Sequence, residues 1–588
     1  MNKPPEIQEV DPESTEIVAT PSEEVINSLP SSDLVDTSLI EETEMPFTQN
    51  QAPAATYTLE NDLMTVTFNS KGGRIAGVEL KEFLKIQEDE NHEELVSQVQ
   101  LFEDTKNSFG YVFESGGREI NTDDLSFAAS TAANEIVFTT GDNQGGLVKH
   151  TYTLSPGSYA VDHKVEIANL PINTERGIDL VIENYLDKIE KNDFFERTYS
   201  TVYYKELNDD SDYCSCRGDD LDDRSDRQME WVSFSNQFFN TAVISKDRPF
   251  AGLIASTNKV DDDAEDLKLT TAAIHMPDQA GSVHQHEMTL YFGPNDYSIL
   301  RSFDNGIVEI IPFGRSIFGD INRAFIRPFF NWLSQFIANK GLVIIVLIFI
   351  IKMALYPLTY KMLHSQAKMG ALKPQLAKMK EKFKDDAQKQ QMETMKVYRE
   401  YGVSPFGGCM PMVLQIPIWY ALFRFFPASI TFRQESFLWA DDLSSYDVLF
   451  YLPFHIPTFG SHVSLFTILW AISTVLYTFY NMRHMDMSAN PAMKYVQYLM
   501  PLMFFAFFNN YASGLTCYMF FSQMITVSQT ILTKKFVFDD EKIMAELNIQ
   551  KAKPKKKSSF QSRLEEAMKQ QQRLQEQKKK DQAKKKKK

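Results

Sequence analysis

Residues 339–359 read NKGLVIIVLIFIIKMALYPLT, and this stretch decides the class of protein. Between Gly341 and Leu358 the single charged residue is Lys352. An apolar run of this length approaches the roughly 20 residues that an α-helix needs to cross a bilayer. A charge inside such a run costs about 2.5–3.5 kcal/mol on insertion, so it usually marks a functional site. The stretch predicts a membrane-spanning helix with Lys352 as its candidate functional residue.

Four more apolar segments follow, which predicts a helical membrane core of five spans over 341–535. The lysine-rich regions 361–402 and 536–588 fall on one side of the membrane if the spans alternate in direction. The positive-inside rule then places both regions in the cytoplasm and the chain before the first span outside. The further spans are expected at Pro405–Pro427, Val463–Tyr480, Tyr495–Phe508 and Leu515–Leu532.

The region 55–300 has a different pattern, with a period of two residues. Met64 and Val66, for example, alternate with polar residues, as in a strand that buries one face. Many short strands separated by glycine-rich turns predict an all-β sandwich domain on the outer side of the membrane. His284 and His286 are expected on a solvated strand face of this domain, and the acidic stretch Asp209–Asp226 is expected to be a loop.

An amphipathic helix is predicted over 321–340, between the sandwich and the first span. Phe325, Phe329 and Trp332 recur near helical spacing, and Arg327 lies between them. This pattern is typical of a helix in the membrane interface. A buried core helix is the alternative interpretation of the same pattern.

The loop 361–402 is predicted to form a cytoplasmic hairpin of two helices. Leu372 and Leu376 share one helical face, and Pro374 is expected to kink the first arm or mark its start. Methionines are adaptable apolar residues, so the loop can serve as a contact surface for clients, although ordinary hairpin packing explains them equally well. The candidate contact residues are Met369, Met379, Met392 and Met395.

The two ends of the chain differ in charge, within a net charge of −18. Residues 1–54 are acidic and without periodicity, which predicts a disordered tether. The region 536–588 is predicted to be a basic cytoplasmic tail, with Lys555, Lys556 and Lys557 in one lysine cluster. Lysine clusters bind ribosomal RNA and anionic lipids alike, and both interpretations stay open.

No Asp or Glu lies inside the five predicted spans to pair with Lys352. The lysine must therefore either reach the interface with its long side chain or face a water-filled cavity. Polar residues in the other spans favour a hydrated groove, whose positive charge would attract client segments that carry Asp or Glu. The candidate groove lining is Gln415, Asn509, Ser513, Thr516, Ser522 and Gln523.

Enzyme chemistry is not predicted, because the sequence contains no P-loop, HExxH, GxSxG or dinucleotide-binding glycine motif. No metal site and no cofactor are predicted either. Three functions fit a membrane core with one buried charge. They are a protein insertase, a transporter or channel for a small anion that uses Lys352, and a passive periplasmic scaffold.

The chain resembles the YidC membrane protein insertases (the YidC/Oxa/Alb family), of the Gram-negative type with a large periplasmic domain. The resemblance rests on 339–359, on Gln366–Met369 and Leu372–Gln375, and on short motifs in the later spans and the β region. Those further motifs are Pro405–Pro411, Gln415–Ile418 and Ser513–Leu515 in the spans, and Asn69–Gly73 and Tyr291–Pro294 in the β region.

The resemblance implies a multi-pass protein of the bacterial inner membrane, with a periplasmic β domain and a cytoplasmic hairpin and tail. It implies insertion and folding of membrane proteins, alone or with the Sec translocon, without ATP or metal. The implied partners are nascent membrane proteins, the Sec translocon, the ribosome and anionic lipids, and not DNA. Many members carry arginine at the position of Lys352. Members of this type begin with a signal-anchor span, so a further span is expected before Met1.

Overall fold

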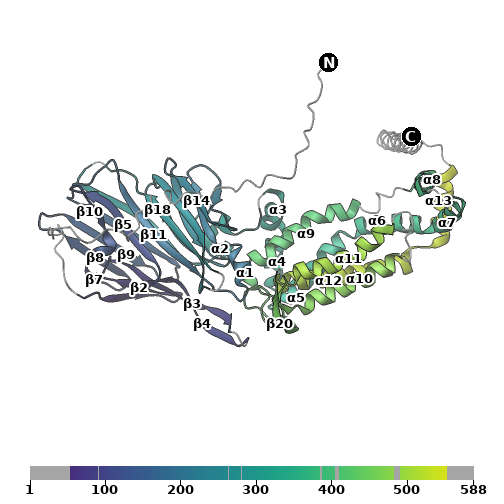
Figure 1. Cartoon of the computed structure of the whole chain (residues 1–588), viewed down its shortest axis with the longest axis horizontal. Coiled ribbons are helices and arrows are strands. Elements are labelled where there is room, and N and C mark those ends of the chain that lie inside the picture. The colour runs from purple at the N-terminus through teal and green to yellow at the C-terminus, as the bar shows by residue number, and fades with distance from the viewer. Residues whose placement is uncertain are drawn as a thin grey trace, which may run out of the picture.

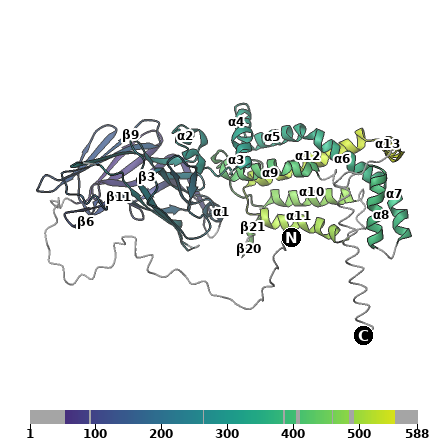
Figure 2. The same ribbon diagram turned by 90° about the horizontal axis from the view of Figure 1, so that it is seen from above.

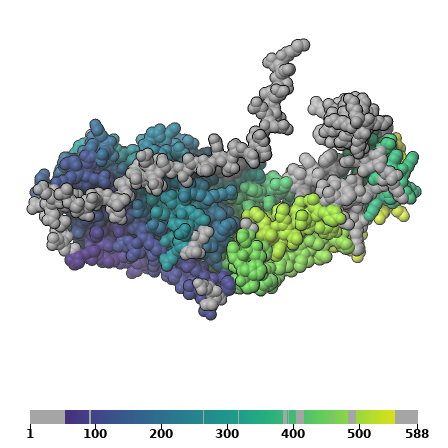
Figure 3. Space-filling model, viewed as in Figure 1, coloured from purple at the N-terminus to yellow at the C-terminus, as the bar shows by residue number. Residues whose placement is uncertain are grey.

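The computed structural model describes residues 53–89, 92–261, 264–279, 281–314, 316–383, 387–403, 410–457, 459–482 and 491–552. A β part lies at one end of the long axis and a helical part at the other (Figure 1). The space-filling view shows the two parts in direct contact (Figure 3). Lys555, Lys556 and Lys557, and the predicted tether apart from its last two residues, lie outside the described residues.

The β part contains three antiparallel sheets that share one apolar core. In strand β2 (Met64–Asn69), Met64, Val66 and Phe68 are fully buried, and the residues between them are half-buried. This alternation is the physical reason why the region folds as strands with one inward face. An all-β sandwich therefore precedes the helical part, as predicted.

In two of the three sheets of the β part, the order of the strands differs from their order in the chain. The nine-stranded sheet consists of β13 (Ser211–Tyr213), β12 (Thr201–Glu206), β15 (Met229–Ser235), β16 (Phe239–Ser245), β19 (Val283–Pro294), β10 (Ala160–Ala168), β9 (Leu147–Leu154), β8 (Glu135–Gly141) and β7 (Ala128–Thr131). The six-stranded sheet consists of β14 (Asp220–Arg224), β17 (Gly252–Lys259), β18 (Asp266–His275), β11 (Ile178–Asp187), β5 (Ser108–Ser115) and β6 (Arg118–Asn121). The four-stranded sheet, which alone keeps the chain order, consists of β1 (Thr56–Glu60), β2, β3 (Arg74–Glu88) and β4 (Glu94–Glu103).

The expectation that His284 and His286 lie on a solvated strand face is wrong. Their side chains are only 7% and 3% exposed. Both lie on the face of β19 that also carries Met288 and Leu290, and this face points into the sandwich. The period of two is the same for both faces of a strand, so the alternation alone does not tell which face is inside.

The helical part begins with a segment that links it to the β part. This segment comprises α3 (Ser316–Ile321), a π-helical turn η4 (Asn322–Ile326) and α4 (Arg327–Ser334). The predicted interfacial helix thus starts earlier and ends earlier than 321–340. The short helices α1 (Asp193–Arg197) and α2 (Tyr297–Arg301) belong to the β part.

Long helices run side by side away from the β part, and a smaller cluster lies at their far end (Figure 2). The long helices are α5 (Lys340–Ala354), α9 (Met410–Ala428), α10 (Leu465–Met482), α11 (Pro491–Phe508) and α12 (Ser513–Leu532). The far-end cluster is made of α7 (Lys373–Lys382), α8 (Ala387–Glu400) and α13 (Asp540–Ala552), and α6 (Tyr356–Ala371) leads into it.

The helices differ in how far their length and composition suit a bilayer span. Within the part of the chain that the structure describes, no single helix is both long and apolar enough to cross a membrane. Helices α5 and α6 meet the requirement together, with a bend of 61° between them. Leu465–Asn481 and Tyr495–Phe508 are shorter apolar helices.

A buried polar contact joins the β part to the loop after α9. Arg433 donates from Nε to Glu190 Oε1 at 2.7 Å, and their side chains are 3% and 8% exposed. Arg433 also donates to the carbonyl oxygen of Leu84 in β3, and its guanidinium lies over the ring of Phe239. Burial raises the pKa of Glu190, while the positive charge of Arg433 opposes this shift. The two parts are therefore held in a defined relative position.

Candidate functional site

Lys352 lies in the last turn of α5, just before the bend into α6. Asn339 caps the start of α5 by accepting a hydrogen bond from the Leu342 amide. At the other end the helix stops at Ala354, and Pro357 follows in the first turn of α6. Carbonyl groups in the last turn of a helix have no partner within the helix, so polar groups gather near such an end. The bend therefore explains why a polar site can form beside Lys352.

The half-buried ammonium of Lys352 is held by helix α12. Its Nζ donates to the hydroxyl oxygen of Thr526 at 3.0 Å, and Thr526 donates in turn to the Ser522 carbonyl oxygen at 2.8 Å. The side-chain amide of Gln529 donates to the Lys352 carbonyl oxygen at 3.3 Å. Neutral partners thus surround both the charge and the backbone of Lys352.

A polar stripe runs along the second half of α12 and continues past its end. Thr530 exchanges a hydrogen bond with Tyr477 of α10 at 3.2 Å, and Thr533 exchanges one with Tyr356 of α6 at 3.0 Å. Residues three or four apart share one face of a helix, so these side chains face α5, α6 and α10 together. The stripe consists of Ser522, Thr526, Gln529, Thr530 and Thr533.

No carboxylate among the described residues forms an ion pair with Lys352. Its charge is satisfied by a single neutral hydroxyl, which is a weaker partner than an anion. Two opposite charges attract each other far more strongly near apolar protein than in water. The site is therefore suited to bind a carboxylate that arrives from outside the chain.

The structure brings only some of the predicted groove residues together. Ser522 contributes its carbonyl oxygen to the Thr526 bond, and Gln523 follows it on α12 with a half-buried side chain. Gln415 is half-buried on α9, and within the described chain the hydroxyl that binds the Lys352 ammonium comes from α12. Of the predicted lining, Ser522 is therefore the residue that the hydrogen bonds link to Lys352.

Asn509, Ser513 and Thr516 have structural roles at the opposite end of α12. The Asn509 side chain donates to the His462 carbonyl oxygen at 2.8 Å, and the Ser513 hydroxyl donates to the Asp442 carbonyl oxygen at 2.7 Å. The Thr516 hydroxyl donates to the Ser513 carbonyl oxygen at 3.2 Å. Ser513 and Thr526 are separated by about 20 Å along the helix, at about 1.5 Å per residue. The hydrogen bonds of these three side chains therefore lie away from Lys352.

The sequence-based prediction missed Thr526, Gln529, Thr530 and Thr533. Their spacing of three and four residues is a usable signal, because it places polar groups on one face of a largely apolar helix. The prediction instead favoured the residues near the start of α12, where the turn after α11 is conspicuously polar. Which polar residues face Lys352 depends on how α5 and α12 pack, and this is not visible in either segment alone.

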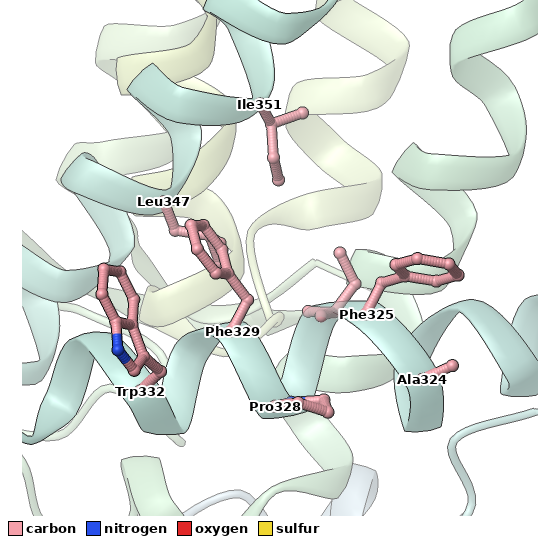
Figure 4. A pocket seen from close by; sticks show the side chains of 8 residues that line it. Ala324, Phe325, Pro328, Phe329, Trp332, Leu347 and Ile351 are labelled. Carbon is pink, nitrogen blue, oxygen red and sulfur yellow. The ribbon is translucent and has the colours of Figure 1, made fainter.

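A separate apolar hollow lies on the side of α5, next to the segment that links the two parts. Its volume is about 430 Å³, and all its lining residues are apolar. Phe325 and Phe329 point from the linking segment toward the same space as Leu347 and Ile351 of α5 (Figure 4). The hollow is therefore suited to hydrocarbon and not to charged groups. The remaining lining residues are Ala324, Ile326, Pro328 and Trp332.

The predicted methionine contact surface falls on the far-end cluster. Met369 lies on α6, Met379 on α7, and Met392 and Met395 on α8, and all four are half-buried. Met369 packs beside an apolar cluster that joins α13 to the base of α7 and α8. The buried residues of this cluster are Leu372, Tyr401, Val403, Ile543 and Leu547.

Among the residues that the structure describes, no group of three or more His, Cys, Asp or Glu side chains is placed to hold a metal ion. Cys214 and Cys216 are unpaired, and Cys214 is fully buried in the β part.

Comparisons with known proteins cover both parts of the chain. Residues 56–332 match the family model described as the YidC periplasmic domain, and residues 332–541 match the model described as 60Kd inner membrane protein. A membrane protein insertase YidC of Parabacteroides distasonis is 36% identical over 536 residues, which are 87% of this chain and 82% of that one. A membrane protein insertase YidC of Bacteroides fragilis is 33% identical over 541 residues, which are 89% of this chain and 86% of that one.

Among solved structures, a galactose mutarotase-like protein from Lactobacillus casei covers 40% of this chain and is itself covered completely. Its TM-score is 0.26 and its identity 11%, a likeness too small to carry an argument. The relatives and the two family models, by contrast, agree over nearly the whole described chain. The chain belongs to the YidC family of membrane protein insertases.

Proposed function

We propose that the chain inserts membrane proteins by way of Lys352 and the polar stripe of α12. A client segment with an acidic residue would exchange the Thr526 hydroxyl for its own carboxylate as the partner of Lys352. The observation that carries this proposal is the hydrogen bond of 3.0 Å from the Lys352 ammonium to a neutral hydroxyl, with no anion paired to it in the described chain. Polar groups on α12 would bind water and so shorten the apolar path that the client must cross.

The proposed arrangement in the membrane follows the distribution of basic residues. Helices α5, α9, α10, α11 and α12 would cross the inner membrane, with α5 completed by the start of α6. The β part would lie in the periplasm, and α7, α8, α13 and the basic tail in the cytoplasm. The cytoplasmic surface would meet nascent membrane proteins and the ribosome, and the inserted chain could come directly or from the Sec translocon. Lys555, Lys556 and Lys557 would bind ribosomal RNA or anionic lipid.

The test is the insertion of a small single-span client with an acidic outer tail into proteoliposomes that contain the full chain. Protease protection of the tail measures the initial rate. We expect Lys352→Ala to lower this rate about tenfold, which corresponds to about 1.4 kcal/mol of lost attraction in the rate-limiting step. The matched control is Lys361→Ala, an exposed lysine on α6.

Replacing the acidic client residues with Asn and Gln gives the second arm of the test. The difference in insertion rate between the parent chain and the Lys352→Ala variant should then disappear, because the client no longer carries the charge that Lys352 attracts. If Lys352→Ala inserts the acidic client at the full rate, the charged-groove mechanism is wrong, although the family assignment stands.

A further inference from the structure

A two-stranded ribbon lies at the ends of α10, α11 and α12 that face the β part. Strand β20 (Phe450–Ile456) pairs with β21 (Gly460–Val463). The ladder joins Phe450 to Val463 and Tyr451 to His462, and it resumes only at Ile456 and Gly460. The residues between Tyr451 and Ile456 therefore bulge away from the partner strand, and Pro453 among them has no amide to donate.

The ribbon exposes large apolar side chains. Phe450 is 50% exposed and Phe454, in the bulge, is 60% exposed. Leu449 and Ile456 are also exposed, at 46% and 37%. An isolated two-stranded ribbon is marginally stable in water, and large apolar side chains that are exposed together on one short element mark a contact surface.

One side of the ribbon is fixed by polar and aromatic contacts. The Tyr451 hydroxyl donates to Glu88 Oε1 of β3 at 2.8 Å, and its ring stacks on His92 with centroids 3.6 Å apart. His462 donates from Nε2 to the Asn509 carbonyl oxygen at 3.1 Å, at the turn between α11 and α12. The ribbon is thus held between the β part and the helix ends, and its apolar side chains remain exposed in the described chain.

The position of the ribbon indicates what covers these side chains. Helix α10 begins at Leu465, two residues after β21 ends, and no Asp, Glu, Lys or Arg occurs from Val448 to Met482. The ribbon lies at the same end of the helices as α4, whose Trp332 is 49% exposed (Figure 2). Aromatic residues at the ends of membrane helices characteristically lie in the lipid headgroup region. A lipid surface therefore fits both the composition and the place of the ribbon.

We propose that the β20–β21 ribbon is a membrane anchor that enters the outer leaflet of the phospholipid bilayer. Phe450, Phe454 and Ile456 would lie at the boundary between headgroups and acyl chains, as in proteins that bind one face of a membrane. Tyr451, through Glu88, would hold the β part at a fixed height above this surface. The inference rests on the proposed function, since that places α10 across the membrane.

The experiment measures the depth of a fluorophore attached to the full chain in proteoliposomes. Phe454→Cys is labelled with an environment-sensitive dye in a chain in which Cys216 and Cys409 are replaced by Ser. Cys214 and Cys517 can stay, because they are fully buried and do not react with the dye. Phospholipids that carry a nitroxide near the headgroup quench from the lipid side, and iodide quenches from the water side. Phe450→Cys serves as a second probe if the first variant folds poorly.

Two control sites make the outcomes distinguishable. Leu221→Cys, on β14, is 49% exposed and should be quenched by iodide alone. Phe349→Cys, on α5, is 54% exposed and should be quenched by the lipid nitroxide. We expect the dye at position 454 to lose at least half of its emission to the lipid nitroxide and little to iodide.

Three results would overturn the anchor. If position 349 is quenched by lipid but position 454 behaves like position 221, the membrane arrangement stands and the anchor is wrong. If neither 349 nor 454 is quenched by lipid, the proposed spans fail and the anchor falls with them. If position 454 is shielded from lipid and iodide only when a client is present, the ribbon binds client protein instead of lipid.

Discussion

A single hydroxyl, that of Thr526, determines how the Lys352 ammonium is held in the resting chain. Thr526→Val keeps the shape of the side chain and removes this hydrogen-bond acceptor. We expect the insertion rate of an acidic client to change by less than about fivefold, since one hydrogen bond contributes about 1 kcal/mol and the charge remains. The rate is measured by protease protection of the client. If Thr526→Val is as inactive as Lys352→Ala, the orientation of the ammonium matters more than its charge.

His286 gives the β part a stability that depends on pH. Burial and the nearby Arg248 lower its pKa from 6.5 to about 4, with His284 adding to the shift and Asp247 opposing it. The unfolded chain therefore binds a proton between pH 6.5 and 4 that the folded chain does not, so the free energy of unfolding falls as the pH falls through this window. The contribution of this one group is at most about 3 kcal/mol.

The matching experiment compares the chain with His286→Met by thermal unfolding at about pH 7.5 and about pH 4.5, on either side of most of this window. Neither ring nitrogen of His286 has a hydrogen-bond partner among the described residues, so the replacement leaves no buried polar group unpaired. We expect the variant to lose less stability on acidification than the parent chain. Equal losses in both chains would show that His286 is already charged in the folded state or is accessible to water.

At the scale of residues, the sequence predicts the charge of the site but not its surroundings. Lys352 is conspicuous because a lone charge in an apolar run costs free energy on membrane insertion, so such a charge usually has a function. Its partner Thr526 is not conspicuous, because threonine is common in membrane helices and often bonds only its own backbone. The packing of α5 on α12 determines which hydroxyl binds the ammonium. This packing depends on two segments that are far apart in the sequence, so neither segment alone predicts it.

At the scale of elements, helix α13 closes the far-end cluster against α6. Leu547 is 1% exposed in the cluster with Ile543 and Leu372, and Glu546 forms an ion pair with Lys368 at 3.0 Å. A buried leucine replaced by alanine loses about 2–5 kcal/mol, whereas an exposed ion pair contributes at most about 1 kcal/mol. The apolar contact therefore holds α13 in place.

Leu547→Ala should release α13 from α6. We expect faster amide hydrogen exchange in α13 and in the adjoining end of α8, with the β part unaffected. Ile549→Ala, at a side chain that is 59% exposed, is the matched control and should leave the exchange rates unchanged. Unchanged protection in Leu547→Ala would mean that α13 is held by its charged contacts.

Strands of the β part with an alternating pattern can be predicted from the sequence, whereas its acidic edge strands cannot. Periodic strands such as β2 follow from their own residues, whereas the acidic composition of Asp209–Asp226 predicts a loop. The structure places β13 (Ser211–Tyr213) and β14 (Asp220–Arg224) there, at the edges of the nine-stranded and six-stranded sheets, where they pair with β12 and β17. An edge strand can be formed by charged residues because one side of it faces water, and such a strand has no apolar alternation to reveal it.

At the scale of the whole molecule, the ion pair of Arg433 and Glu190 joins the β part to the helical part. Arg433→Met would leave the Glu190 carboxylate buried without its partner, which costs about 3–5 kcal/mol. We expect a lower melting temperature and faster proteolysis at the junction. Arg176→Met, which breaks an exposed pair with Glu114, is the control and should have little effect.

The double variant Glu190→Leu with Arg433→Met should recover most of the lost stability, because two apolar side chains can replace a buried ion pair. Acid provides a second check. Removing Arg433 raises the pKa of Glu190 further, so Glu190 is more easily protonated in the single variant and then needs no charged partner. The stability of the single variant should therefore differ less from that of the parent chain at about pH 5 than at about pH 8. A double variant as unstable as the single one would show that Arg433 acts through its bond to Leu84 and not through its charge.

The contact between the two parts cannot be predicted from the sequence. Along the chain, Arg433 is only a single base in an otherwise acidic stretch, and Glu190 has no distinguishing pattern around it. The order of the parts does follow from the sequence, since the period of two and the long apolar runs occupy separate regions. Relative placement depends on complementary surfaces, and these exist only once both parts have folded.

Helix α12 connects the β part to the Lys352 site. At its start, the turn before it receives a hydrogen bond of 2.7 Å from Asn192 of the β part to the Asn510 carbonyl oxygen. In its second half, Thr526 accepts the hydrogen bond from Lys352. When two ligands both change the position of the same helix, each ligand changes the binding affinity of the other, and the two effects are equal in free energy. If an acidic client binds Lys352 as proposed, a ligand of the β part that shifts α12 changes the affinity for that client, and the client changes the affinity for the ligand by the same factor.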